Sequence, residues 1–208
     1  MDQVEPMRLA IKQKLQDLEI DPTQPIDEKA LVRAMGASLT VVTQALDRLA
    51  LEGLVTKQRG RYHVARASMA SIVREISEVR TVLEGMCARL AAERVTAEQT
   101  ARMEQAHREF ERVIKDGDNR ALLAVDRKFH QALYEASGNR FLARALDDMY
   151  ALIYRLYFFS LDRIGSVRAN VEEHREILDA IKAGDGRNAE RLIQQHIAHF
   201  QTMVERLL

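Results

Sequence analysis

The chain has 208 residues, of which 47% are hydrophobic and 30% are charged, and its 31 basic and 31 acidic side chains give a formal net charge of zero. No run of about 18 apolar residues occurs, which excludes a membrane-spanning helix, and the first residues lack the features of a signal peptide. Nine glycines and three prolines over this length favour a mostly helical protein. The single cysteine, Cys87, excludes an internal disulfide and fits a reducing cytoplasm, and we interpret it as a core residue rather than a reactive thiol.

Residues 1–66 predict three helices followed by a β-hairpin. Residues 21–25 end the first helix, whose apolar residues recur at helical spacing: Met7, Ile11, Leu15 and Leu18. Asp27 is a candidate N-cap for a short second helix that Gly36 ends, and Ser38 is a candidate N-cap for the third helix. The inward face of the third helix carries Val42, Ala45, Leu46 and Leu49.

The hairpin is predicted from two short apolar runs, residues 54–56 and 62–64, that flank a basic tip formed by residues 57–61. No acidic residue occurs between residues 57 and 66, although the net charge of the whole chain is zero. Three helices and a hairpin in this order describe a winged helix-turn-helix, an architecture that typically binds DNA.

From residue 67 onward the sequence shows no strand pattern and predicts an antiparallel all-α bundle of about six helices. The expected helices cover residues 71–94, 97–115, 120–136, 140–161, 167–183 and 186–207, with turns at residues 116–119, 137–139 and 184–186. Thr96 can cap the second of them. The residues of the first that we expect to face inward are Ile72, Ile76, Val79, Leu83, Met86 and Leu90.

Four titratable side chains fall on the apolar faces of three of these helices: Asp126, His130, His174 and His196. Asp126 and His130 are one helical turn apart, so their side chains converge. A single histidine on such a face is most often a hydrogen-bonded core residue, because an unpaired titratable group is costly to bury. Three histidines and one carboxylate together instead favour a shared divalent metal such as Zn²⁺, Ni²⁺ or Mn²⁺. Neighbouring His199 lies off the centre of its helix face and is expected to be more exposed.

Residues 28–38, residues 45–55 and the pair Arg59-Gly60 carry a resemblance to the GntR family of bacterial transcription regulators, which extends over residues 7–66. The resemblance implies that the third helix enters the major groove of DNA and that the hairpin, or wing, contacts the backbone or the minor groove. The DNA-binding candidates are Lys29, Ser38, Thr40, Thr43, Gln44, Arg48, Lys57, Arg59, Gly60 and Arg61.

The start of the third helix departs from the family pattern. GntR recognition helices usually open with Ser-Arg-x-Pro-Val-Arg, whereas this chain has Leu39 and Thr43 in place of the two arginines. Arginine reads guanine well because its planar fork matches two acceptors on the base. The departure predicts either an operator that differs from the usual family site or weaker DNA binding, and a winged helix used only for protein contact stays an alternative.

The C-terminal part resembles the FCD ligand-binding domain of the FadR subfamily of GntR regulators. The matching residues are 126–130, 137–139, 173–181 and 196, and the resemblance covers nearly all of residues 71–207. It implies that Asp126, His130, His174 and His196 ligate the metal, and that the effector is a small organic acid. The effector-binding candidates are Arg80, Asn139 and Tyr154.

The role of Arg80 is open at this level. It borders the inward face of its helix, where the resemblance places an arginine whose fork could clamp a carboxylate. Glu84 follows one helical turn later, so a salt bridge between the two residues is an equal alternative. The aromatic residues between Tyr154 and Phe159 could line a cavity, although aromatic residues at helical spacing more often belong to a core or a dimer contact.

The two parts together predict a homodimeric, cytoplasmic transcription regulator, for example a repressor, with a DNA-binding domain over residues 1–66 and an effector-binding and dimerisation domain over residues 67–208. Its partners would be operator DNA and a small carboxylic acid, and the short connector at residues 66–68 would transmit movement between the domains. We expect no enzyme. A metal-dependent hydrolase is one alternative, but the sequence has no HExxH motif and Glu173 points about 100° away from His174 on a helix. The other alternative is a regulator-derived protein with weakened sequence-specific DNA binding.

Overall fold

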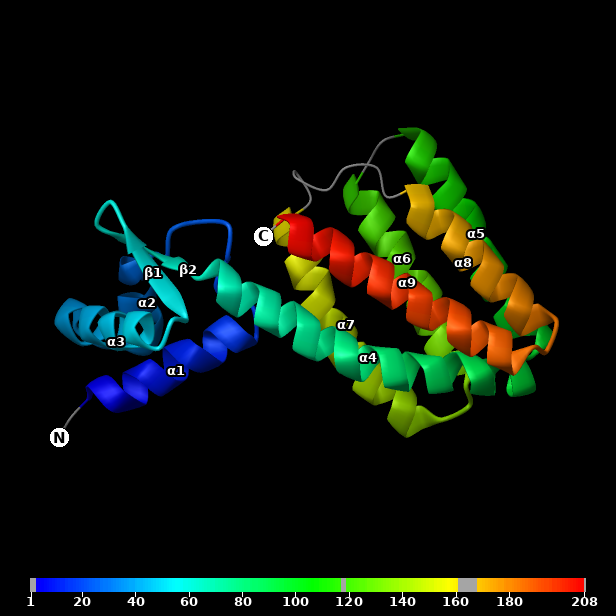
Figure 1. Cartoon of the computed structure of the whole chain (residues 1–208), viewed down its shortest axis with the longest axis horizontal. Coiled ribbons are helices and arrows are strands. Elements are labelled where there is room, and N and C mark those ends of the chain that lie inside the picture. The colour runs from blue at the N-terminus through cyan, green and yellow to red at the C-terminus, as the bar shows by residue number, and fades with distance from the viewer. Residues whose placement is uncertain (1–2, 117–118, 161–167, 208) are drawn as a thin grey trace. The chain divides into compact units, whose positions relative to one another are not determined.

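The computed structural model describes residues 3–116, 119–160 and 168–207, and in this part of the chain helices follow one another along the sequence, with one β-hairpin between the third helix and the fourth (Figure 1). The chain divides between Ile72 and Val73 into two compact units, and each is described by itself. The turn predicted at residues 116–119 falls largely outside the described residues, as do the side chains of Tyr157, Phe158 and Phe159.

The first unit contains three helices and the hairpin in the predicted order: α1 (Val4–Gln16), α2 (Glu28–Met35), α3 (Leu39–Leu51), β1 (Val55–Gln58) and β2 (Arg61–Val64). Both predicted N-caps are confirmed, because the Asp27 carboxylate accepts from the backbone N–H of Ala30 at 2.9 Å and the Ser38 hydroxyl accepts from that of Val41 at 3.3 Å. Gly36 ends α2 in the left-handed region at φ 63°. The inward face of α3 is also confirmed, since Val42, Ala45, Leu46 and Leu49 are buried.

Two local predictions in this unit were wrong. The first helix ends at Gln16, so Leu18 lies outside it at φ 52°, although its side chain is still buried in the core. The hairpin loop is shorter than predicted, because strand pairing continues to Gln58 and Arg61 and leaves only Arg59 and Gly60 as the turn. Both turn residues have positive φ, at 50° and 77°, which is the geometry that a two-residue hairpin turn requires.

The second unit is a helical bundle, as predicted. It is built from α4 (Arg66–Arg94), whose residues up to Ile72 belong to the first unit, and from α5 (Ala97–Asp116), α6 (Asn119–Ala136), α7 (Arg140–Ser160), α8 (Arg168–Lys182) and α9 (Gly186–Leu207). Helix α5 packs against α6 and α8, α6 packs against α7, and α8 packs against α9. Thr96 caps α5 as expected: its hydroxyl accepts from the N–H of Gln99, whose side chain accepts from the N–H of Thr96 in return. Gly138 ends α6 at φ 65°.

Helix α4 differs most from its prediction. It begins at Arg66 rather than residue 71, so the expected connector at residues 66–68 is helical. Its inward face was predicted correctly for Leu90, which is buried, but Val79 and Met86 are exposed while Arg80 and Glu84 are buried. The apolar pattern failed because the two buried charges pair with each other, with 2.5 Å between Arg80 Nε and Glu84 Oε1.

The core of the second unit is formed by apolar side chains of α4 to α9, including Phe129, Leu133, Ile177 and Ile193. Cys87 belongs to this core and is fully buried, which confirms its interpretation as a core residue. Burial raises the pKa of the Cys87 thiol to about 12. Among the described residues, no helix is both long enough and apolar enough to cross a membrane.

Candidate metal centre and DNA-binding surface

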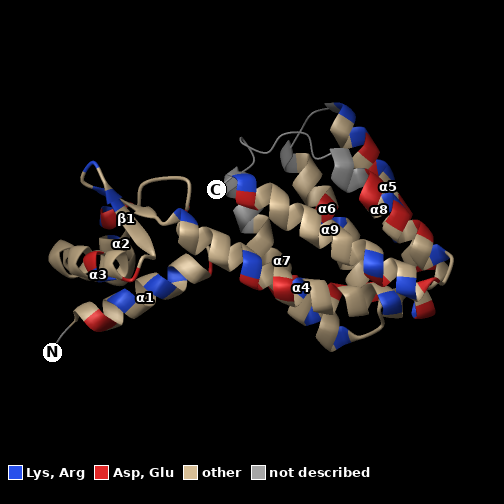
Figure 2. Ribbon diagram, in the orientation of Figure 1, with Lys and Arg blue, Asp and Glu red and all other residues tan. Residues whose placement is uncertain are grey.

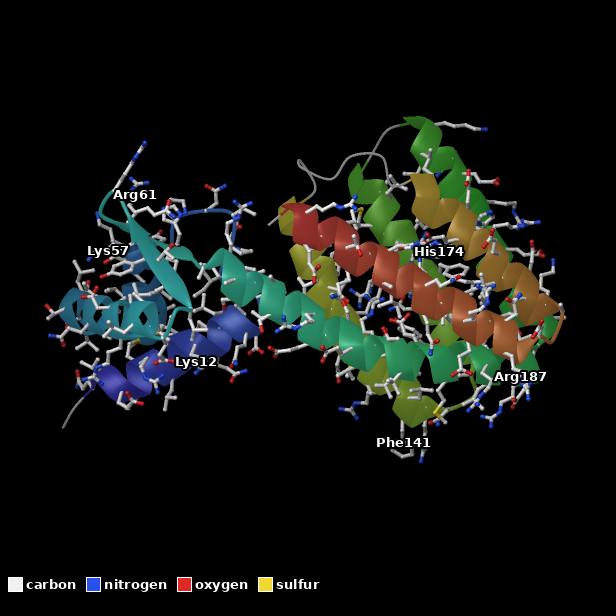
Figure 3. The ribbon with its side chains drawn as sticks, in the orientation of Figure 1. Lys12, Lys57, Arg61, Phe141, His174 and Arg187 are labelled. Carbon is white, nitrogen blue, oxygen red and sulfur yellow. The ribbon has the colours of Figure 1, made fainter. Side chains whose placement is uncertain are left out.

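The bundle brings together the four residues that the sequence singled out as metal ligands. Helix α6 contributes Asp126 and His130, α8 contributes His174 and α9 contributes His196, and all four side chains are buried (His174 is labelled in Figure 3). Each offers one ligand atom, and these atoms lie within 4.8 Å of one another. Around one tetrahedral Zn²⁺ with bonds of about 2.0–2.2 Å, ligand atoms lie about 3.3–3.6 Å apart, so the four side chains would have to move closer together to hold one ion.

The carboxylate of Asp126 faces two of the imidazoles. Its Oδ1 lies 3.5 Å from Nε2 of His174 and its Oδ2 lies 3.9 Å from Nε2 of His130. The ring of His196 completes the group, with its centroid 4.6 Å from that of His174 and 5.6 Å from that of His130. Three imidazoles and one carboxylate form a donor set suited to Zn²⁺, Ni²⁺ and similar ions.

His174 is the residue that best fits a metal ligand in this group. It is fully buried and stacks on Phe129 at a ring-centroid distance of 4.3 Å, yet neither of its ring nitrogens has a hydrogen-bond partner. Burial, followed by the charges of His196, His130 and His107, holds the pKa of His174 well below its usual value. A neutral imidazole is the form that binds metals, and both nitrogens of His174 are free of hydrogen-bond partners.

Two glutamates that were not predicted as site residues contact the ligand histidines. Glu84 of α4 places Oε2 3.0 Å from Nδ1 of His130, while its other oxygen pairs with Arg80. Glu173 of α8 places Oε2 2.7 Å from Nδ1 of His196. The sequence analysis considered Glu84 only as a partner of Arg80, and Glu173 only as a residue that points away from His174. Helical spacing relates residues of one helix, so it does not indicate a partner on another helix.

The same glutamates carry perturbed acidities. Burial alone would raise the pKa of Glu84, but the charges of Arg80 and His130 outweigh it and hold that pKa far below its usual value. Burial would also raise the pKa of Glu173, but the hydrogen bonds with His196 and His199 outweigh burial, and this pKa is lowered. Both carboxyl groups are therefore ionised at neutral pH and act only as hydrogen-bond acceptors.

Two further contacts complete the surroundings of the cluster. The hydroxyl of Tyr150 on α7 donates to Oδ2 of Asp126, an interaction that the sequence did not indicate. His199 is 67% exposed in its side chain, as expected, and its Nδ1 lies 2.5 Å from the second oxygen of Glu173.

The three effector candidates lie in different surroundings. Arg80 is buried and paired with Glu84, which is the salt-bridge alternative of the sequence analysis, and this pair connects Arg80 to the histidine cluster. Tyr154 is half-buried and packs against the core. Asn139 serves as a helix cap, because its side-chain oxygen accepts from the backbone N–H groups of Phe141 and Leu142 at 3.2 Å.

The DNA-binding candidates on α3 differ in exposure and in pairing. Thr40, Gln44 and Arg48 are exposed, but Arg48 Nη1 donates to Glu5 at 3.3 Å. Thr43 is half-buried, and its hydroxyl donates a hydrogen bond to Glu28 at 3.1 Å. Leu39, in the place of a family arginine, is 51% exposed at the start of the helix.

The wing carries most of the exposed positive charge of the DNA-binding candidates, which gathers at the tip of the hairpin (Figure 2). Arg59, Gly60 and Arg61 are exposed, and Lys29 is exposed on α2. Lys57 is partly neutralised, because its ammonium donates to the Tyr62 hydroxyl at 2.9 Å and lies 3.6 Å from Asp47 (Lys57 and Arg61 are labelled in Figure 3).

Comparisons with known proteins agree with both halves of this description. The family model of bacterial regulatory proteins of the gntR family matches residues 5–62, and the FCD domain model matches residues 75–199. A probable D-xylose utilization operon transcriptional repressor of Paenarthrobacter nicotinovorans is 30% identical over 181 residues, covering 85% of this chain and 77% of that protein. The HTH-type transcriptional repressor RspR of Escherichia coli is 28% identical over 190 residues, covering 90% and 82%.

Solved structures share the fold. Escherichia coli McbR/YncC superposes with a TM-score of 0.63 at 20% identity and covers 98% of this chain and 97% of its own. A structure described as the metal-free FCD domain of TM0439 superposes with a TM-score of 0.55 at 18% identity, over 66% of this chain and 94% of its own.

Proposed function

The chain belongs to the GntR family of bacterial regulatory proteins and carries an FCD domain, and from this premise we propose that it regulates transcription in response to a small carboxylic acid sensed at a divalent metal. It is a transcription regulator and not an enzyme, since its family and its relatives are regulators. Within the family we assign it to the FadR subfamily, as a cytoplasmic homodimer that acts as a repressor, the activity named for two relatives.

The proposed division of labour follows the sequence domains. Residues 1–66 bind operator DNA, and residues 67–208 bind metal and effector and form the dimer. In a two-fold dimer, the two α3 helices would enter successive major grooves while the wings contact the adjacent backbone. Arg59 and Arg61 on the wing would contribute positive charge against the phosphates.

One observation carries the proposal for the metal: Asp126, His130, His174 and His196 meet inside the bundle, and His174 has no hydrogen-bond partner there. These four residues would hold Zn²⁺ or Ni²⁺, with Mn²⁺ as a further candidate. The bound ion would supply an electrophilic centre at which a carboxylate can replace water. Arg80 would add positive charge near that carboxylate while it stays paired with Glu84.

Metal content tests this proposal directly. Purified wild type, incubated with Zn²⁺ and then freed of loosely bound ions, should contain about one metal per chain by mass spectrometry. His174→Ala should contain almost none, while His63→Ala on the wing strand β2 should match wild type because it removes a histidine from the other unit. A metal-free wild type after incubation with Zn²⁺, Ni²⁺ and Mn²⁺ in turn would contradict the proposed site.

The effector proposal has its own test. In the metal-loaded protein, small mono- and dicarboxylates should raise the melting temperature, and the uncharged amides of the same acids should not, because only an anionic oxygen ligates the metal well. His174→Ala should lose this response. A response that survives in the metal-free variant would move the effector site away from the histidine cluster.

A weakened sequence-specific interaction with DNA is a second candidate, favoured by the exposed Leu39 at the start of α3. Leu39→Arg should then raise affinity for an operator of the usual family type, because arginine can read guanine there. Thr43→Arg is a less clean variant, since it also removes the hydrogen bond to Glu28. No gain with Leu39→Arg on such a site would indicate that the chain recognises a different operator.

A further inference from the structure

Glu84 and Glu173 lie outside the proposed ligand set, yet each contacts Nδ1 of one of its histidines. We infer that these two glutamates are positioning residues, which hold His130 and His196 so that the Nε2 of each ring is presented to the metal. The inference rests on the proposed metal site and adds to it a second set of residues, contributed by α4 and α8.

The geometry places Nδ1 of each ring beside a glutamate oxygen. Nδ1 of His130 lies 3.0 Å from Glu84 Oε2, and Nδ1 of His196 lies 2.7 Å from Glu173 Oε2. In a hydrogen bond to a carboxylate oxygen at this distance, the ring nitrogen Nδ1 is the donor. A neutral imidazole has a single N–H, and Nε2 is therefore left with a free lone pair, the form in which it can bind a metal.

The two glutamates are held differently. Glu84 is fully buried and its second oxygen is fixed by the equally buried Arg80, so its orientation is set within α4. Glu173 is partly exposed, and its second oxygen is shared with the exposed His199. Glu84 is therefore the more rigid support, and Glu173 is the one whose substitution leaves the core undisturbed.

The four ligands also differ in what supports them. Asp126 accepts a hydrogen bond from the Tyr150 hydroxyl. Nδ1 of His130 contacts Glu84, and Nδ1 of His196 contacts Glu173. His174 has no such partner and is held by ring stacking on Phe129. Removing a supporting hydrogen bond of this kind typically weakens metal binding by about 10–100-fold.

The first test uses the metal-free protein and reads the ring protons themselves. Long-range ¹H–¹⁵N spectra above pH 8 should show His196 protonated at Nδ1 in the wild type, with the signal assigned from the His196→Gln variant. Glu173→Ala should shift His196 toward protonation at Nε2, and Glu173→Gln should retain the Nδ1 proton because the amide oxygen still accepts. Glu176→Ala removes an exposed carboxylate of α8 and should leave the His196 signal unchanged.

The second test measures Zn²⁺ affinity by competition with a chelating dye. Glu173→Ala should bind Zn²⁺ about 10–100-fold more weakly than wild type, and Glu173→Gln should recover part of the loss. Glu176→Ala should match wild type, which separates the hydrogen bond from the general effect of a nearby negative charge. Equal affinities for Glu173→Ala and Glu176→Ala would overturn the inference.

Glu84→Gln extends the test to His130, with circular dichroism to check that the variant is folded. The Co²⁺-substituted protein should show an altered visible spectrum in this variant, because the ring of His130 turns relative to the metal. An unaltered spectrum in a folded variant would overturn the role of Glu84, and an unfolded variant leaves the Glu173 series to decide. Failure of wild type to bind any metal would contradict the proposed function, whereas a wild-type His196 protonated at Nε2 would contradict the positioning role even with metal bound.

Discussion

The two units of this chain place their functional side chains in opposite environments. In the second unit, Asp126 and three histidines are enclosed by helices, and their partners Glu84 and Tyr150 are buried as well. In the first unit, the DNA-binding candidates lie on the outside, and the side chains of Arg48, Thr43 and Lys57 are joined to neighbouring acids.

The difference has a physical consequence for how each unit works. A buried polar group is costly without partners, so the cluster must be organised before its ligand arrives. An exposed ion pair contributes little and is easily exchanged, so the side chains of α3 and the wing can leave their acidic partners for phosphates. We therefore expect substitutions inside the bundle to change folding and metal affinity, and substitutions on the winged helix to change DNA affinity alone.

We expect the largest loss of stability from breaking the buried pair of Arg80 and Glu84. Glu84→Leu leaves the guanidinium of Arg80 buried without its partner and should lower the free energy of unfolding by about 3–5 kcal/mol in urea denaturation. The double variant Arg80→Met/Glu84→Leu should recover most of the loss, because neither charge of this pair is left buried without the other. Glu98→Ala, which breaks the exposed pair with Arg102, should have little effect. Equal losses from the buried and the exposed pair would remove the contrast between interior and surface.

Metal should stabilise one unit and not the other. With free Zn²⁺ at 100 times its dissociation constant, the bundle should gain about 2.7 kcal/mol. Hydrogen exchange measured residue by residue should show slower exchange in α6, α8 and α9 and unchanged exchange in α2 and α3. A similar gain in both units would mean that they unfold together.

Acidification should affect the bundle first. Because the folded pKa of His174 lies below its unfolded value, the unfolded chain takes up a proton at a higher pH than the folded one. The contribution of His174 to stability is therefore complete above its unfolded pKa, near neutral pH, and is lost as the pH falls toward its folded pKa. In metal-free protein, His174→Leu should flatten the dependence of unfolding free energy on pH between about 7 and 5. An unchanged slope would show that other groups control this range.

The smallest effects are expected on the wing. Arg59→Ala should weaken binding to a duplex of arbitrary sequence several-fold and reduce the salt dependence of binding by about one unit of slope. Lys57→Ala should have a smaller effect, because its ammonium is already shared with Tyr62 and Asp47. The order of the two variants would reverse if Lys57 exchanged these partners for a phosphate without cost.

The contrast between interior and surface also explains what the sequence could predict. The cluster could be found because a histidine or aspartate on an apolar helix face is unusual, and four of them on three helices suggest a common partner. Helix order and caps could be predicted because Asp27, Ser38 and Thr96 act on neighbouring residues.

The remaining features depend on contacts between distant segments. Glu84 meets His130 across 46 residues of sequence, and no periodic pattern indicates such a pair. The buried pair of Arg80 and Glu84 was likewise missed on α4, since apolar periodicity assumes that charges face outward. On the winged helix, exposure is the ordinary state of a polar residue, so the pairing of Lys57 with Asp47 carried no signal in the sequence.

The burial of Cys87 has a practical consequence. Thiol-specific labels react with the thiolate, and a thiol whose pKa is raised to about 12 inside the core offers almost none at neutral pH. The wild-type chain is therefore a nearly silent background for site-directed spin labelling. A single cysteine introduced by Arg61→Cys would carry one nitroxide per chain. In the proposed dimer, pulsed electron paramagnetic resonance would then measure the separation of the two wings in solution, with and without metal and acid.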